Sequence, residues 1–339
     1  MLWERVYAWG EDSEPHQALR HLFIEVAAVL QASGYQAHHL LRFLMTQLGI
    51  PPRNLLSMFA QLGASGCIQM TEAHIDDPCG RVGMWLTADA AGRNQCDCLQ
   101  WLHERGYPWS SKATENAAAR GCLRCLRYAH EHGCPWNKWA TTGAALTGHT
   151  ACLQYALEHG CPHNSNVALL AANHGHLACL QVAVEHGCLY GSACAVIAAT
   201  HGHLHILQYL HSIGLEWTTN CAHHAAGHGN LQCLEFLHAS GCPWDETTCS
   251  QACRSGSDRC LRYAREHGCP WDATTCSWAI RYDNAPCLEY ALQNGCPHDL
   301  RDLLLQAAQL PSVQCLEILL PMYTYEPGEQ VEVPPYCRP

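Results

Sequence analysis

The feature that most constrains this chain is a repeat of 27 residues. A tetrapeptide that begins as Gly-Tyr-Pro-Trp at Gly106 recurs every 27 residues, most often as Gly-Cys-Pro-Trp. The glycines that open its copies are Gly106, Gly133, Gly160, Gly187, Gly214, Gly241, Gly268 and Gly295. A Cys-Leu pair, as at Cys125, and a second glycine, as at Gly121, keep the same register. Self-similarity at a fixed period of this size is typical of solenoids, so about eight or nine stacked units are predicted.

Each unit reads as two short helices. In the unit that opens at Gly133, that glycine is predicted to cap the preceding helix, because glycine adopts the left-handed conformation at little cost. Gly148 is predicted to end the first helix, and a second helix with an apolar stripe is predicted over about 150–159. In another unit, Thr248 with Gln251 fits a capping box. A single unit cannot bury its stripe alone, so neighbouring units must stack.

The phrase Ala-Ala-Asn-His-Gly-His-Leu at 171–177, followed by Gly187, resembles the ankyrin repeat. The resemblance covers about 84–320 and implies an all-α, ankyrin-like solenoid of stacked helix-turn-helix units. An ankyrin unit has about 33 residues, whereas the period here is 27. The segment that forms a β-hairpin in the family is replaced by Pro-Trp-x-x-x-Thr, as at Trp271. The chain therefore resembles a short Gly-Cys-Pro-Trp subclass, with truncated or absent hairpins and little or no strand.

The ends of the chain differ from the array predicted over 81–320. Residues 1–80 lack the register but show helical patterns, which fit either a helical N-terminal cap or a docking segment for a second protein. Residues 321–339 contain five prolines and no periodicity, so they are predicted to be a disordered tail.

Cysteine and histidine, 24 of each, suggest metal or disulfide chemistry. Cys122 and Cys125 form Cys-x-x-Cys, which resembles a zinc ligand pair. Adjacent stacked helices lie about 8–10 Å apart, however, which is too far for equivalent residues to share one ion or a disulfide. Ile206 and Leu215 also replace column cysteines, as apolar packing sites allow. We therefore expect buried thiols that act as small hydrophobes, with no metal site and no cofactor.

Thiol chemistry, if present, is expected at cysteines outside the two main columns. These are Cys122, Cys194, Cys221, Cys249, Cys253 and Cys276.

Repeated histidines lie in the turns between helices, where they are predicted to hydrogen-bond to loop carbonyls. They are His149, His176 and His203 after a glycine, and His132, His159, His186 and His267 before one. Repeated residues cannot all be catalytic, and the chain carries no nucleophile elbow, phosphate-binding loop or His-Glu-x-x-His motif. We therefore expect no enzymatic activity.

Composition excludes further classes of function. The formal net charge is −11 and only two residues are lysine, which argues against a nucleic-acid binder. No run of 18 apolar residues and no secretory signal is visible, so we expect no membrane insertion. The expected compartment is the cytoplasm or the nucleus, and the expected state is monomeric.

The resemblance implies that variable side chains on the inner helices bind a protein partner along the concave face. These residues are Arg120, Asn173, His174, His201, His224, His228, Arg254, Trp278, Arg281 and Tyr282. The column of His174, His201 and His228 suggests pH-sensitive binding. A loop aromatic ladder either packs on the adjacent loops or contributes hot spots for binding. It consists of Trp109, Trp136, Trp217, Trp244 and Trp271.

The sequence thus predicts a non-catalytic scaffold for protein–protein interaction. Two alternatives stay open. The chain could be a substrate-recruiting adaptor of a ubiquitin ligase, with 1–80 docking the ligase; the scarcity of lysine fits this but also follows from an arginine-biased codon composition. It could instead be a metal- or redox-responsive protein that uses its cysteine and histidine columns.

Overall fold

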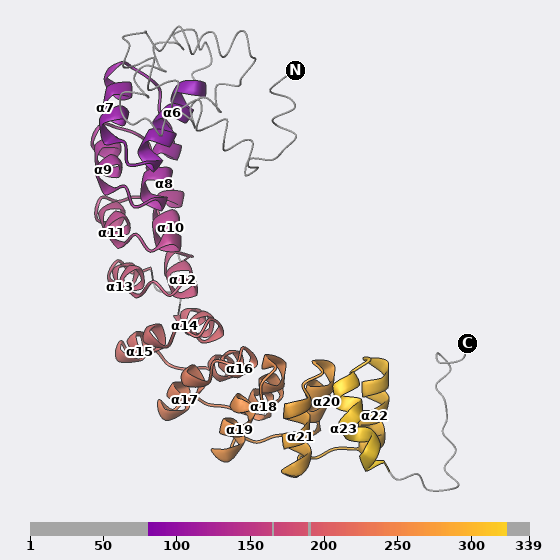
Figure 1. Ribbon diagram of the computed structural model, residues 1–339. Helices are drawn as coiled ribbons and strands as arrows, with labels where there is room; N and C mark the ends of the chain where they lie inside the picture. The colour runs from indigo at the N-terminus through magenta and orange to yellow at the C-terminus, as the bar shows by residue number, and fades with distance from the viewer. Residues whose placement is uncertain (1–80, 165, 189–190, 324–339) are drawn as a thin grey trace, which may run out of the picture. The chain divides into compact units, whose positions relative to one another are not determined.

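The computed structural model describes residues 81–164, 166–188 and 191–323 (Figure 1). The predicted cap or docking segment 1–80 lies outside the described residues, as does all of the predicted tail beyond Tyr323. The start of that tail is ordered here, since Pro321 belongs to a 3-10 turn over Leu320–Met322.

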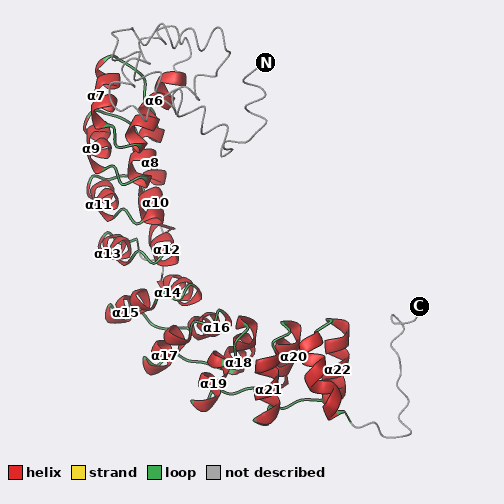
Figure 2. Cartoon of the chain, in the orientation of Figure 1, coloured by secondary structure: helices red, strands yellow, loops and turns green. Residues whose placement is uncertain are grey.

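The described residues form 18 α-helices in nine consecutive pairs and contain no strand (Figure 2). The first helices of the pairs are α6 (Arg81–Gly92), α8 (Ser111–Ala119), α10 (Lys138–Thr147), α12 (Asn166–Asn173), α14 (Gly191–Thr200), α16 (Thr219–Gly227), α18 (Glu246–Ala252), α20 (Ala273–Arg281) and α22 (Leu300–Gln309). The second helices are α7 (Cys96–Glu104), α9 (Leu123–Glu131), α11 (Thr150–Glu158), α13 (Leu177–Glu185), α15 (Leu204–Ser212), α17 (Leu231–Ala239), α19 (Arg259–Glu266), α21 (Ala285–Gln293) and α23 (Val313–Leu319). The predicted helix-turn-helix repeat is confirmed.

Where the Pro-Trp-x-x-x-Thr pattern occurs, in α18 and α20, the first helix of the pair begins two residues before the threonine. In α10 the N-cap is Asn137, whose side chain accepts a hydrogen bond from the Trp139 amide. In α18 the capping box joins Asp245 to Thr248. The predicted box of Thr248 with Gln251 is therefore wrong, because the shorter aspartate side chain at 245 already satisfies the first-turn donors.

In most of the described units, two glycines adopt the left-handed conformation that ends a helix. Gly148 caps α10 at φ 79° and Gly133 follows α9 at φ 81°, which confirms both predicted helix ends. The column of Gly121 is also crowded, because a Cβ atom at 121 would lie 2.5 Å from Nδ1 of His149 in the next repeat.

The chain divides into two compact units. One contains the described residues up to Ala171 together with Ala178–Cys188, and the other contains Ala172–Leu177 together with the described residues from Gly191 onward. In the first unit, α8 packs against α6 and α10 while α9 packs against α7 and α11. In the second unit, α14, α16, α18, α20 and α22 pack successively in one row (Figure 1).

Cys-Leu pairs and alanines fill the core between the helices. Cys125, Leu126 and Ala129 of α9 are completely buried, and Ile206 is completely buried in the same register one unit later than Cys179. This confirms the apolar character of the cysteine column. Within the part of the chain that the structure describes, no helix is both long and apolar enough to traverse a bilayer.

Candidate functional site

Cysteines of the Gly-Cys-Pro-Trp motif join each repeat to the one before it. The Cys134 thiol donates to the carbonyl of Ser110, the N-cap residue of α8, at 3.4 Å. The Cys161 thiol makes the same 3.4 Å hydrogen bond to Asn137, and Cys269 bonds to Asp245 at 3.2 Å. At these positions cysteine is a small, buried residue that also donates one weak hydrogen bond.

Threonines of the first helices make the reciprocal contact. The Thr114 hydroxyl donates to the carbonyl of Pro135 in the next repeat at 3.0 Å, and Thr141 does the same to Pro162 at 3.2 Å. In the second unit the same register holds Cys249, whose thiol donates to the carbonyl of Cys269 in the next repeat at 4.0 Å. In the first unit, hydrogen bonds therefore cross the boundary between repeats in both directions. Cysteine thiols donate to the preceding repeat, and threonine hydroxyls donate to the next one.

The residue after the second glycine also bonds to the preceding repeat. His203 Nε2 bonds to the carbonyl of Asn173 at 3.0 Å, and Asn230 donates to the carbonyl of Ala199 at 2.8 Å. Cys122 occupies the same register and donates to the carbonyl of Gly92 at 3.6 Å. Cys122 therefore replaces a structural histidine, and the expectation that it is a separate chemical site has no support in this geometry.

Histidines in the Glu-His-Gly turns hydrogen-bond to the last turns of the second helices. Nδ1 of His132 bonds to the carbonyl of Tyr128 at 2.8 Å, and His159 and His267 repeat this bond to Tyr155 and Tyr263. A carbonyl only accepts, so Nδ1 carries the proton in each ring. The predicted bonding to carbonyls is confirmed for these three, although the acceptors lie in the last helical turn and not in a loop.

The predicted aromatic ladder is a series of contacts between repeats. Trp136 stacks on His130 of the preceding repeat, with ring centroids 3.8 Å apart and planes 14° apart. Trp136 and Tyr155 of its own repeat meet edge to face, and the Tyr155 hydroxyl hydrogen-bonds to Nδ1 of His130 at 2.9 Å. The same arrangement surrounds Trp109 and Trp244. These half-buried rings pack on neighbouring elements, as one of the two predicted roles requires.

The ladder changes in two later repeats. Trp217 stacks on His211 at a longer centroid distance of 5.6 Å, and its buried Nε1 lacks a hydrogen bond. Trp271 has the Arg265 guanidinium over its ring at 4.6 Å in place of an imidazole.

Three histidines that stack on ladder tryptophans have shifted protonation equilibria. Burial, assisted by the neighbouring His132, holds the pKa of His103 below its usual value. Burial and the following turn histidine lower the pKa of His130 and His238 in the same way. These rings are therefore neutral at physiological pH and suited to packing.

The predicted partner-binding residues lie at the C-terminal turns of first helices. Eight of them are exposed, and the other two, Asn173 and Trp278, are half-buried. The exposed residues are Arg120, His174, His201, His224, His228, Arg254, Arg281 and Tyr282. All but Arg120 belong to the second compact unit.

One aromatic and arginine cluster stands out among these residues. Trp278 and Tyr282 stack with centroids 5.7 Å apart, and the Arg281 guanidinium lies 5.5 Å from the Trp278 ring. Tyr282 is 43% exposed. Neither Arg281 nor Arg254 forms an ion pair within the described residues.

Thiol chemistry has little room in the described residues. All 21 cysteines there are buried and unbridged, and no three His, Cys, Asp or Glu side chains are arranged to hold a metal ion. Burial raises the pKa of Cys134 and Cys161 to about 12, so both thiols are protonated at neutral pH. A protonated thiol is a poor nucleophile and a poor metal ligand.

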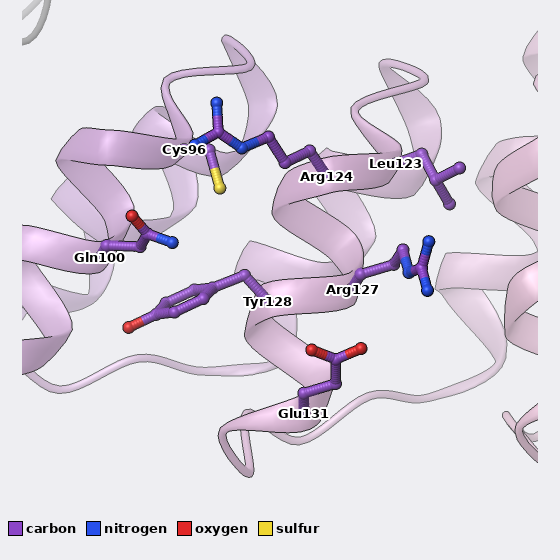
Figure 3. A pocket seen from close by; sticks show the side chains of 7 residues that line it. All are labelled: Cys96, Gln100, Leu123, Arg124, Arg127, Tyr128 and Glu131. Carbon is purple, nitrogen blue, oxygen red and sulfur yellow. The ribbon is translucent and has the colours of Figure 1, made fainter.

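A depression that the sequence did not indicate lies between α7 and α9 and has a volume of about 580 Å³ (Figure 3). Its lining residues are Cys96, Gln100, Leu123, Arg124, Arg127, Tyr128 and Glu131. Arg124 is held by Asp97 at 2.8 Å, and Arg127 lies 5.5 Å from the Tyr155 ring. Burial raises the pKa of Cys96, so this depression offers no activated nucleophile. Only the three-dimensional packing of two repeats brings these residues together.

No protein-family model and no curated protein matches this chain. Among solved structures, it is similar to the human ASB11 ankyrin repeat domain, with 21% sequence identity and a TM-score of 0.41 over 46% of this chain and 84% of that one. The described residues themselves show helix pairs repeated every 27 residues without strand. Their fold is the all-α, ankyrin-like repeat array that the sequence predicts.

Proposed function

We propose that this chain is a non-catalytic scaffold that binds a protein partner through the C-terminal turns of its first helices. The observation that carries the proposal is the cluster of Trp278, Arg281 and Tyr282 at the end of α20. Tryptophan, tyrosine and arginine are the residue types most enriched at binding hot spots. The same turns carry other variable, exposed side chains on a scaffold that otherwise repeats.

The cluster has features that favour binding over scaffold packing. Position 282 is part of a register that holds Arg120, His174, His201 and His228 in other repeats, so the scaffold does not require an aromatic ring there. The Arg254 and Arg281 guanidinium groups have no carboxylate partner among the described residues. A partner could therefore bury Tyr282 and pair with either arginine without first breaking an ion pair.

Proximity labelling in cells with the full-length chain tests the proposal. We expect the double variant Trp278→Ala/Tyr282→Ala to lose a defined group of labelled proteins, and Arg281→Glu to lose the same group. Arg259→Glu is the matched control, because Arg259 is exposed on a second helix of the same compact unit and has no ion pair there. Unchanged labelling in both cluster variants, with folding verified by circular dichroism, would contradict the proposal.

Several narrower expectations accompany it. The ubiquitin-ligase adaptor stays a prediction that depends on 1–80; labelling of ligase components by the full chain, and its loss on deleting 1–80, would support it. The metal- or redox-responsive alternative stays a prediction, and no group of three possible metal ligands among the described residues supports it. The monomeric state and the cytoplasmic or nuclear location stay predictions.

The column of His174, His201 and His228 predicts pH-sensitive binding, which equal affinity at pH 5.5 and 7.5 would contradict.

A further inference from the structure

One basic side chain lies at the C-terminal end of the first helix in each of four consecutive repeats of the second compact unit. These residues, which we call the cationic row, are His201, His228, Arg254 and Arg281. All four are exposed. Their helices α14, α16, α18 and α20 pack successively in one row (Figure 1). The two arginines carry permanent positive charges, and the two histidines add charge when they are protonated.

Acidic residues are kept away from the cationic row. Asp245, Asp272 and Asp299 are N-cap residues, so they lie at the opposite ends of the first helices. Aspartate and glutamate are absent from the segments that contain the row, namely 194–201, 221–228, 249–256 and 275–282. The dipole of each helix contributes only about half a negative charge at its C-terminal end. One guanidinium charge therefore exceeds it.

The two carboxylates in the turns that follow the row already have partners. Asp258 forms an ion pair with Arg262 of α19. Asp283 accepts a hydrogen bond from the backbone amide of Cys315 at 3.2 Å. Neither carboxylate pairs with Arg254 or Arg281. The arginines of the row are therefore available to an anionic group from outside the chain.

The surroundings of His224, one turn before His228, show the same excess of positive charge. Burial lowers the pKa of His224, and the charged groups that add to this effect are His228, His223 and Arg254. All three are cationic when protonated. The carboxylate of Asp245 is bonded to His223 at 2.8 Å, on the side of the N-cap of the next first helix. This region therefore repels cations and attracts anions.

We propose that the cationic row binds an extended, acidic segment of a partner protein, with an apolar side chain of that segment packed on Tyr282. This inference rests on the proposed binding function and names the chemistry of the partner. Adjacent helices lie about 8–10 Å apart. A segment in the polyproline II conformation has three residues per turn and rises about 3.1 Å per residue, so every third side chain faces the row at intervals of about 9 Å. Aspartate or glutamate at every third position would therefore match successive repeats.

A short acidic segment fits the row better than a nucleic acid does. The row has two permanent positive charges, on Arg254 and Arg281, whereas phosphate backbones are bound by larger clusters of lysine and arginine. The formal net charge of the chain is −11. The remainder of the molecule therefore repels an acidic segment and favours its binding along the row alone.

Selection from a library of random peptides displayed on phage tests this inference with the full-length chain. Peptides that bind the wild type but not Trp278→Ala/Tyr282→Ala report on this surface, and we expect them to carry aspartate or glutamate at every third position. The inference is overturned if no selected peptide shows that dependence, or if those that do have no excess of acidic residues. The proposed function is judged separately by proximity labelling, whose outcome does not depend on the charge of the partner.

Fluorescence anisotropy with the labelled consensus peptide supplies the quantitative test. Arg254→Glu and Arg281→Glu should each weaken binding at least about tenfold, and lysine at the facing peptide position should restore it. Arg259→Glu is the matched control, because Arg259 is exposed on α19 and lies outside the row. Wild-type affinity in both row variants would overturn the inference, as would equally tight binding of a single-stranded DNA oligonucleotide.

Discussion

The imidazole of His149 lies directly over Gly121 of the preceding repeat, so close that a Cβ atom at 121 would stand 2.5 Å from Nδ1. Gly121 also has φ 73°, in the left-handed region. Gly133 shares that backbone conformation at φ 81°, but a Cβ atom there would meet nothing within 4 Å. Gly121 therefore needs both a left-handed backbone and the absence of a Cβ atom, whereas Gly133 needs only the left-handed backbone.

These two glycines predict different costs for the same substitution. Gly133→Ala should destabilise the full-length chain by about 1–2 kcal/mol, the usual cost of a left-handed alanine. Gly121→Ala should cost at least about 1 kcal/mol more, because the His149 ring must also move. Urea unfolding followed by circular dichroism measures both free energies of unfolding. His149→Ala should remove most of the difference; equal costs for the two glycines would show that the contact is unimportant.

Cysteine at position 161 is predicted to stabilise the boundary between repeats through its hydrogen bond as well as its volume. Cys161→Ala loses the bond to the Asn137 carbonyl, whereas Cys152→Ala removes the same atoms from a buried site where no carbonyl accepts from the thiol. Cys161→Ala should therefore cost about 0.5–1 kcal/mol more free energy of unfolding than Cys152→Ala. If Cys161→Ala lowers the free energy of unfolding less than Cys152→Ala does, then the cysteine column of Cys161 stabilises the array by packing alone.

Acid is predicted to destabilise the array through the histidines that stack on tryptophan. The pKa values of His103, His130 and His238 are lowered in the folded state, mainly by burial. In the unfolded chain, histidine has a pKa of about 6.5. As the pH falls through and below that value, the unfolded chain therefore binds more protons than the folded chain does. The stability that these neutral rings contribute is present at pH 7.5 and is lost towards pH 5.

Unfolding midpoints in urea at pH 7.5 and 5.5 measure this effect. His238→Gln should reduce the decrease in midpoint between the two pH values, while His186→Gln, in an exposed turn outside these clusters, should leave it unchanged. An undiminished decrease in His238→Gln would assign the acid sensitivity to other groups.

Thiol reactivity should be low despite the cysteine content. The chain has 24 cysteines, of which 21 are described and buried. A thiol reagent at pH 7.5 should therefore modify at most the remaining three quickly, namely Cys67, Cys79 and Cys337. Mass spectrometry of the native protein after brief alkylation counts the modified sites, and the unfolded protein should react at all 24. Rapid modification of Cys122 or Cys276 would contradict the burial described here.

The elements that sequence predicted well are those defined by local chemistry. Gly148 ends a helix because its own backbone conformation requires it, and the apolar stripe of α11 buries Cys152 and Leu153 as its spacing indicates. The predicted capping partner of Thr248 is wrong because both Asp245 and Gln251 are chemically suitable. Only the backbone position of the first turn decides between them.

Contacts between repeats are harder to predict, because their partners are separated by 20 to 36 residues. The Cys134 thiol and the Thr114 hydroxyl both appeared in repeated columns, but sequence did not show that they bond to carbonyls across a boundary. Cys122 looked exceptional because it replaces a histidine, yet it makes the bond that His203 makes elsewhere. For the candidate site, sequence identified Trp278, Arg281 and Tyr282 individually but could not show that they form one cluster.

Hydrogen bonds that recur at several boundaries between described repeats have a consequence for how such a chain can change in length. Ser110 and Cys134 are 24 residues apart, as are Asn137 and Cys161, and Thr218 and Cys242. Duplication or loss of one whole repeat between two such boundaries leaves the new junction with the same donor and acceptor. Within either compact unit, insertions and deletions of 27 residues are thus structurally conservative, whereas a change of a single residue in a turn is not. Natural variation in this protein should therefore occur as whole repeats.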